Sequence, residues 1–105
     1  MKKIVNKKAG FNYQILEKFE TGIVLTGSEV KSIKEGRLKL EEAFVRIKDS
    51  EAWLLNAYIP PYSFSSDNRK DPRRERKLLL KKKELLKLKQ QTEQKGLTLI
   101  PISCY

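Results

Sequence analysis

A basic, leucine-bearing stretch at residues 69–88 constrains what this chain can fold into more than any other feature. Residues 69–90 contain eleven Lys and Arg against three Asp and Glu, so they carry +8 of the total formal charge of +10. The rest of the chain is close to neutral, which makes the positive charge a local feature. Clustered Lys and Arg in a small basic domain are typical of proteins that bind nucleic acid.

Helix signals accompany this charge. Leu78 and Leu79 are followed seven residues later by Leu85 and Leu86, which predicts one apolar side on a helix. Asp71-Pro72 has the composition of a helix start, and Gly96 that of a helix stop. The pattern therefore predicts a basic helical segment over residues 71–95, either continuous or broken near Lys81–Lys83, docked by its leucines and presenting cations to a polyanion.

Residue usage excludes most catalytic chemistry. The 105 residues contain no histidine and a single cysteine, Cys104. This removes His-based acid–base catalysis, Cys–His nucleophiles and nearly all zinc sites. We find no phosphate-binding glycine loop or metalloprotease motif either. The chain is expected to be a single domain, not an enzyme, without metal or cofactor.

Localisation follows from similar arguments. A lone thiol suits a reducing compartment, the first residues do not resemble a signal peptide, and no run approaches the ~20 apolar residues that span a bilayer. A leucine–lysine helix can also lie on anionic lipid, but the apolar side of this one lacks Trp and Phe. The sequence predicts a cytoplasmic protein that does not bind membranes.

Short strands are predicted on both sides of a short helix. Apolar residues at odd positions from 13 to 25 predict a half-buried strand. Thr26 and Glu29 have the spacing of a capping box and Gly36 that of a helix stop, so Glu29 is interpreted as a cap. A change of apolar phase near residues 41–42 predicts a bulge or sharp coil, and Asp49-Ser50 a tight hairpin.

The remaining segments are predicted as follows. Residues 1–9 are expected to form a flexible basic arm, and residues 62–70 a Ser-rich loop. Tyr62 and Phe64 in this loop could stack on bases or pin the loop to the core, and the sequence leaves both readings open. Residues 97–105 predict an apolar strand. An unpaired apolar edge is unfavourable, so either this strand pairs with earlier strands or the polypeptide is a shortened form of something longer.

Blocks along nearly the whole chain resemble one family. NKKAGFNY (6–13), FETGIVLTGSEVKSIKEG (19–36), EAFVRIK and EAWLLNAYIPPY (42–62), DPRRERKLLL (71–80) and KGLTLIPISCY (95–105) are similar to the SsrA-binding protein family, SmpB. The resemblance implies a mainly β fold with flanking helices, an OB-type antiparallel barrel. It also implies binding to the tRNA-like domain of tmRNA, delivery of that RNA to stalled ribosomes in trans-translation, and a monomer when free. The alternative is a general small-barrel RNA-binding or ribosomal protein.

The resemblance also implies site residues. Asn6, Lys7 and Lys8 match the family's basic arm, and Glu20 its FExG acid. Arg73, Arg76 and Lys77 are assigned phosphate contacts in the DPxRxR segment, and Leu79, in the RKLLL block, is assigned either an apolar RNA contact or a buried position. Phe11 follows Gly10 where the family usually has Arg-His, so it keeps a flat stacking surface without the hydrogen-bonding tip. The family continues past residue 105 with another barrel strand and a long basic tail, so the barrel is expected to be incomplete here.

Overall fold

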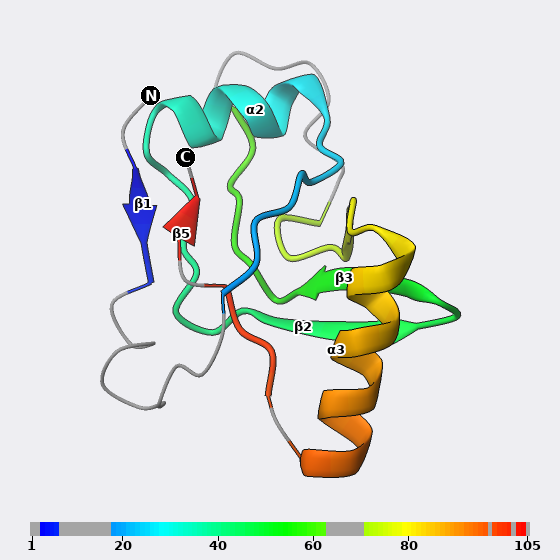
Figure 1. The fold of residues 1–105 in the computed structure, drawn as a ribbon. Helices are drawn as coiled ribbons and strands as arrows, with labels where there is room; N and C mark the ends of the chain where they lie inside the picture. The colour runs from blue at the N-terminus through cyan, green and yellow to red at the C-terminus, as the bar shows by residue number, and fades with distance from the viewer. Residues whose placement is uncertain (1–2, 7–17, 63–70, 97, 102, 105) are drawn as a thin grey trace.

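The computed structural model describes residues 3–6, 18–62, 71–96, 98–101 and 103–104. These residues form two helices and five short strands in the order β1 (Ile4–Val5), α2 (Gly27–Lys34), β2 (Phe44–Lys48), β3 (Glu51–Leu55), β4 (Arg76–Leu78), α3 (Lys82–Lys95) and β5 (Ser103–Cys104) (Figure 1).

The strands make two small antiparallel sheets, ordered β2-β3-β4 and β1-β5. The β2–β3 hairpin turns at Asp49 and Ser50, whose φ angles of 54° and 61° give the left-handed backbone that matches the twist of two-residue hairpins. The expected hairpin is thus confirmed. Two-residue turns of this kind fix the register, so Val45 pairs with Leu54 and Ile47 with Ala52 on one face.

Single bridges extend the three-stranded sheet at both edges. Ile23 bridges Leu78 of β4, and Leu99 bridges Val45 of β2. A mainly antiparallel fold with two helices is therefore present, but the described residues do not close into a barrel.

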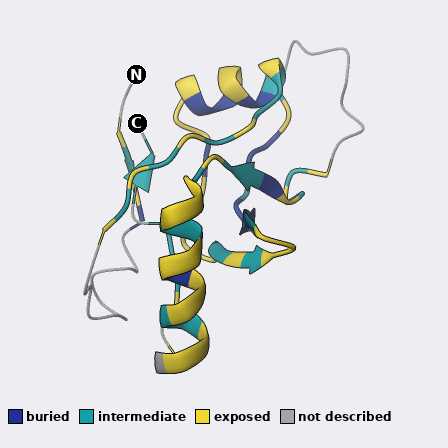
Figure 2. Ribbon diagram, turned by 45° about the vertical axis from the view of Figure 1, so that its right-hand side comes forward, coloured by how far each residue is buried: buried dark blue, intermediate teal, exposed yellow. Residues whose placement is uncertain are grey.

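The core lies between the inner face of this sheet, α2 and the extended segments around it. Its buried members are Ile33, Leu38, Leu40, Ala43, Leu54, Ala57 and Ile59. Figure 2 shows α2 burying one side and exposing the other, as expected of a helix packed across one end of a sheet.

Helix α2 forms as its local signals predict. Thr26 accepts a hydrogen bond from the backbone N–H of Glu29, and Glu29 accepts one from the backbone N–H of Thr26. This reciprocal capping box is confirmed. At the other end Gly36 has φ +76°, the left-handed conformation in which a glycine carries no side-chain strain.

The predicted helical segment over residues 71–95 is wrong in its first half. The carboxylate of Asp71 accepts the N–H of Arg73 in a turn, β4 follows, and α3 begins only at Lys82. Strand pairing with β3 and burial of Arg76 override the local helix preference.

The leucine pattern is redistributed in consequence. Leu78 packs against the core from β4, whereas Leu79 and Leu86 are 57% and 62% exposed. The leucine that α3 buries is Leu88, at 4% exposure. The seven-residue repeat therefore spans a strand and a helix and does not define one docked side.

The expected flexible arm is wrong for the residues that the structure describes within it. Ile4 and Val5 pair with Cys104 and Ser103, and Asn6 is 4% exposed. The prediction that the last segment pairs with earlier strands is confirmed by this sheet and by the Val45–Leu99 bridge.

Candidate nucleic-acid interface

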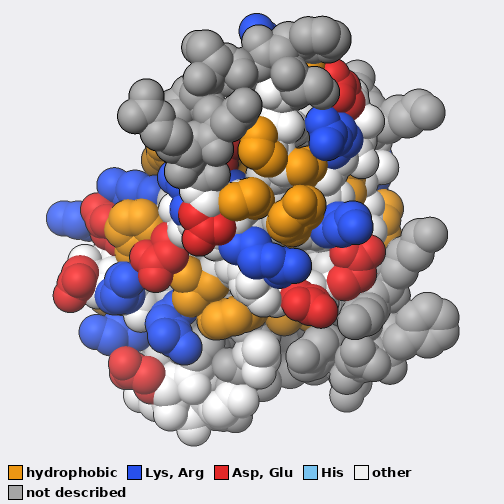
Figure 3. Space-filling view, turned by 180° about the vertical axis from the view of Figure 1, so that it is seen from behind, with side chains coloured by type: hydrophobic (Ala, Val, Ile, Leu, Met, Phe, Trp, Pro, Cys, Tyr) orange, Lys and Arg blue, Asp and Glu red, His pale blue; other side chains and the backbone are white. Residues whose placement is uncertain are grey.

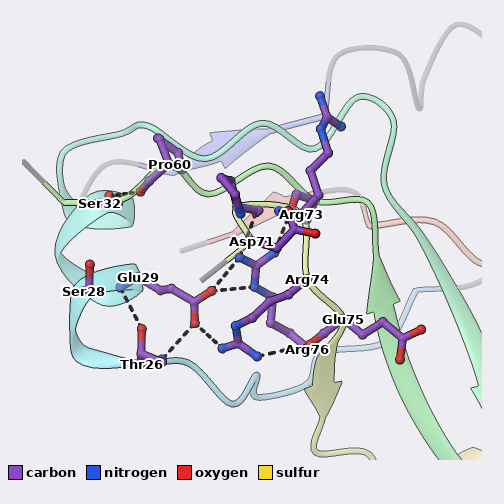
Figure 4. A network of polar contacts seen from close by, with 12 residues as sticks. Thr26, Ser28, Glu29, Ser32, Pro60, Asp71, Arg73, Arg74, Glu75 and Arg76 are labelled. Carbon is purple, nitrogen blue, oxygen red and sulfur yellow. Dashed lines mark hydrogen bonds and ion pairs between the residues drawn. The ribbon is translucent and has the colours of Figure 1, made fainter. Parts of the chain in front are cut away.

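A buried charge network joins two of the chain's most distinctive sequence blocks (Figure 4). Glu29 of α2 accepts hydrogen bonds from Arg74 Nη2 and, at 2.7 Å, from Arg76 Nε. Arg76 is 1% exposed and also donates to the carbonyls of Ala57 at 2.8 Å and Pro72 at 2.9 Å. Its guanidinium is therefore fully used inside the protein, as a buried charge must be.

The network determines the protonation of Glu29. Burial by itself raises the pKa of this carboxyl, but hydrogen bonds from the Thr26 N–H, Arg74 and Arg76, with the charge of Arg76, outweigh it. The pKa of Glu29 is thus held below its ordinary value, and the carboxylate stays ionised at neutral pH.

This lowered pKa predicts acid sensitivity. The folded protein holds fewer protons on Glu29 than the unfolded chain, so the contribution of Glu29 to stability is complete above its unfolded pKa of about 4.3. That contribution is lost as pH falls through the lower, folded-state pKa. We expect Glu29→Gln to flatten the fall in urea midpoint below about pH 4.3, whereas Glu75→Gln, at an exposed ion pair, should leave it steep.

The role assigned to Arg76 as a phosphate contact is wrong, because its side chain is buried and its donors are taken. Lys77 pairs with Glu51 at 2.9 Å, and Arg73 lies 3.8 Å from Glu42 and donates to Asn56. Nearby, Lys48 pairs with Glu75 at 3.1 Å. The cations expected to form a free ridge at residues 73–77 are thus matched by carboxylates. On the face seen in Figure 3, Lys and Arg side chains likewise stand beside Asp and Glu.

Unpaired cations are found on α3 instead. Within the described part of the chain, Lys82, Lys83 and Lys89 form no ion pair, and all three are exposed. Figure 2 shows the outer side of α3 as almost continuously exposed. Positions 82 and 89 are two turns apart on the same side of the helix, so these ammonium groups can face one polyanion together.

Leu79 precedes this helix by three residues, and Glu20 follows Phe19, whose ring a lysine of the helix approaches. The N–H of Leu79 donates to the Gly22 carbonyl at 2.9 Å, and a Cβ at Gly22 would come within 3.3 Å of the Leu79 side chain. Lys87 of α3 places its ammonium 5.6 Å from the centre of the Phe19 ring. For reference we use the name Leu79 surface for a set of residues chosen by exposure and by nearness in the chain to Leu79, Phe19 or the exposed side of α3: Glu20, Gly22, Leu79, Lys82, Lys83, Lys87 and Lys89.

The other predicted site residues, besides Arg73, Arg76 and Lys77, fall into three groups. Glu20 is exposed and Leu79 is exposed, which favours an apolar contact over burial for Leu79. Asn6 is buried and donates to the carbonyls of Leu40 and Pro101, so an RNA contact by its side chain is wrong for this structure. Lys7, Lys8 and Phe11 lie outside the described residues.

The aromatic residues of the predicted loop are only partly placed. Tyr62 is half-buried, its N–H donates to Ser28 Oγ, and Lys31 lies 5.4 Å from the centre of its ring. These contacts favour the reading in which Tyr62 pins the start of the loop. Phe64 lies outside the described residues.

No helix in the described ranges is long and apolar enough to cross a membrane. Among the same residues, no group of three or more His, Cys, Asp or Glu side chains is arranged to hold a metal ion.

Comparisons with known proteins agree on one family. The sequence model of the family described as SmpB protein matches residues 3–105. The SsrA-binding protein of Sulfurihydrogenibium sp. is 57% identical over 100 residues, which cover 95% of this chain and 66% of that protein. The SsrA-binding protein of Treponema denticola is 52% identical over 100 residues, with 95% and 65% covered. This chain thus spans just under two thirds of the length of these curated relatives.

A solved structure, "tmRNA-SmpB: a journey to the center of the bacterial ribosome", contains a chain with the same fold. Its TM-score is 0.79 at 48% identity, covering 98% of this chain and 72% of that one. Because the family match extends over almost all residues and its distinctive blocks form the Glu29 network and the Leu79 surface, this chain belongs to the SmpB family.

Proposed function

We propose that this protein binds the tRNA-like domain of tmRNA and helps to deliver that RNA to stalled ribosomes in trans-translation. The observation that carries the proposal is the SmpB family match over residues 3–105. The relatives are named for binding SsrA, and the similar solved structure is of tmRNA-SmpB and the bacterial ribosome.

The Leu79 surface supplies chemistry that suits this role. The unpaired lysines of α3 can neutralise RNA phosphates and release counterions, which gives affinity without sequence readout. Leu79 offers an apolar contact, and Glu20 can accept hydrogen bonds from ribose hydroxyls or base amino groups. We infer that these cations, the apolar contact and the acceptor together favour a folded RNA.

The remaining expectations belong to the same proposal. We infer a non-enzymatic, monomeric protein of the cytoplasm, since the function needs binding and delivery and no bond chemistry. We also infer that the small sheets form part of an OB-type antiparallel barrel.

A competition experiment tests the proposal. Labelled tRNA-like domain of tmRNA is bound to the protein at fixed salt, and unlabelled bulk tRNA or rRNA fragments are added as competitors. We expect the tRNA-like domain itself to compete far better than either. Equal competition by all RNAs would overturn tmRNA specificity and leave a general RNA-binding protein.

Leu79→Ala should weaken binding without unfolding the protein. Leu79 is 57% exposed, so truncation costs the fold little, whereas burying Leu79 against RNA is worth roughly 1–2 kcal/mol, a factor of about 5–30 in Kd. Val30→Ala, at a 36% exposed apolar side chain on α2, is the matched control and should bind as the unmodified protein does. Equal Kd values for all three proteins would remove Leu79 from the interface.

A further inference from the structure

Glu29 is linked to the Leu79 surface through β4. Arg76, which Glu29 holds, is the first residue of β4, and Leu79 follows the last residue of the same strand. On the opposite side of β4 from β3, Val24 donates to the Lys77 carbonyl at 2.9 Å and Leu79 donates to the Gly22 carbonyl at 2.9 Å. The position of β4 therefore determines where Leu79 meets Gly22.

Arg76 fixes that position from inside the protein. Its guanidinium has three different acceptors, on Glu29, Ala57 and Pro72, and is 1% exposed. A slip of β4 by one residue would turn Arg76 to the other face of the sheet and leave the Glu29 carboxylate without its main partner. The charge pair thus selects a single register for a strand of only three residues.

We propose that Glu29 is a positioning residue for RNA binding: it touches no RNA, but through Arg76 it fixes β4 and so presents Leu79 and the first turn of α3. This inference rests on the proposed function, because the Leu79 surface is its binding face. It also explains why a chain built for binding a polyanion keeps a carboxylate buried beside two arginines.

The test uses Glu29→Gln in the full chain, which keeps the side-chain shape and an acceptor for the helix cap but removes the charge. Glu75→Gln, at the exposed pair with Lys48, makes the same change of charge in the same segment and serves as control. Two quantities are measured: Kd for the tRNA-like domain of tmRNA, and hydrogen exchange at the Val24 and Leu79 amides. Both are repeated with trimethylamine oxide, so that differences in the folded fraction are removed.

We expect Glu29→Gln to raise Kd about tenfold and to speed exchange at Val24 and Leu79 while β2–β3 amides stay protected, with or without osmolyte. Glu75→Gln should change neither quantity. The double variant Glu29→Gln/Leu79→Ala should lose less binding free energy than the two single variants lose in sum, because both substitutions act on one surface.

Three results would overturn the inference: unchanged Kd in Glu29→Gln, raised Kd with both amides still protected, or an equal effect of Glu75→Gln. If Glu29→Gln does not fold, Arg76→Lys is used with the same readouts, since it keeps the charge but cannot reach three acceptors. If the unmodified protein fails to bind the tRNA-like domain, the proposed function is wrong, and the amide exchange still decides whether Glu29 fixes β4.

Discussion

Arg76→Ala should lower the free energy of unfolding by about 3–5 kcal/mol, the range for breaking a buried ion pair by removing one partner. The substitution leaves a buried oxygen of Glu29 and the carbonyls of Ala57 and Pro72 without their donors. Urea unfolding followed by Trp53 fluorescence measures this loss. An unchanged slope of unfolding free energy against urea concentration would show that the same cooperative unit unfolds.

Lys77→Ala is the matched control for this change. Lys77 is the next residue in β4, but the side chains of Lys77 and of its partner Glu51 are both about 40% exposed. Losing this ion pair should therefore cost less than about 1 kcal/mol of unfolding free energy. A loss of similar size in both variants would mean that the Arg76 network contributes no more than a surface pair.

Replacing Lys82, Lys83 and Lys89 together by Gln should weaken RNA binding and reduce its salt dependence. Each phosphate contact contributes about 0.7–0.9 to the slope of log K against log salt, so three contacts contribute about 2–3. The ratio of unmodified to variant affinity should therefore rise about 20- to 40-fold when salt is lowered from 200 to 50 mM. Gln is a good helix former, so α3 should persist.

The control removes three cations that the fold already pairs. Lys48, Arg73 and Lys77 changed to Gln alter the net charge by the same amount but should leave the salt slope close to that of the unmodified protein. If this control flattens the slope and the α3 variant does not, the RNA surface lies on residues 73–77 as the sequence alone predicts, and the Leu79 surface is not the binding face.

Features set by neighbouring residues could be predicted from the sequence. The capping box of Thr26 and Glu29 and the turn at Asp49 and Ser50 depend on side chains within a few positions of one another. The exposed lysines of α3 also belong to the predicted basic segment. Their exposure is predictable because a surface helix exposes one face whatever it packs against.

Features set by distant partners could not be predicted. Asp71-Pro72 has the composition of a helix start, but a strand follows it. In that strand Arg76 is held by Glu29, which lies 47 residues earlier in the chain. The family resemblance assigns Asn6 to a basic arm that contacts RNA, whereas its side chain donates to the Pro101 carbonyl, 95 residues away. The sequence spacing of Arg74 and Arg76 contains one signal, because two arginines only two residues apart can reach the same carboxylate, as both do here at Glu29.

The pairing of β1 with β5 has a consequence for how the chain acquires its fold. Ile4 meets Cys104 across nearly the entire sequence, so among the strand pairings of the described residues this one bears the largest loop-closure entropy and should form last. At about 5–20 residues per second, the N-terminal strand waits on the order of 5–20 s during synthesis before its partner is made. Until then Ile4 and Asn6, which the finished protein covers, are open to solvent and to chaperones.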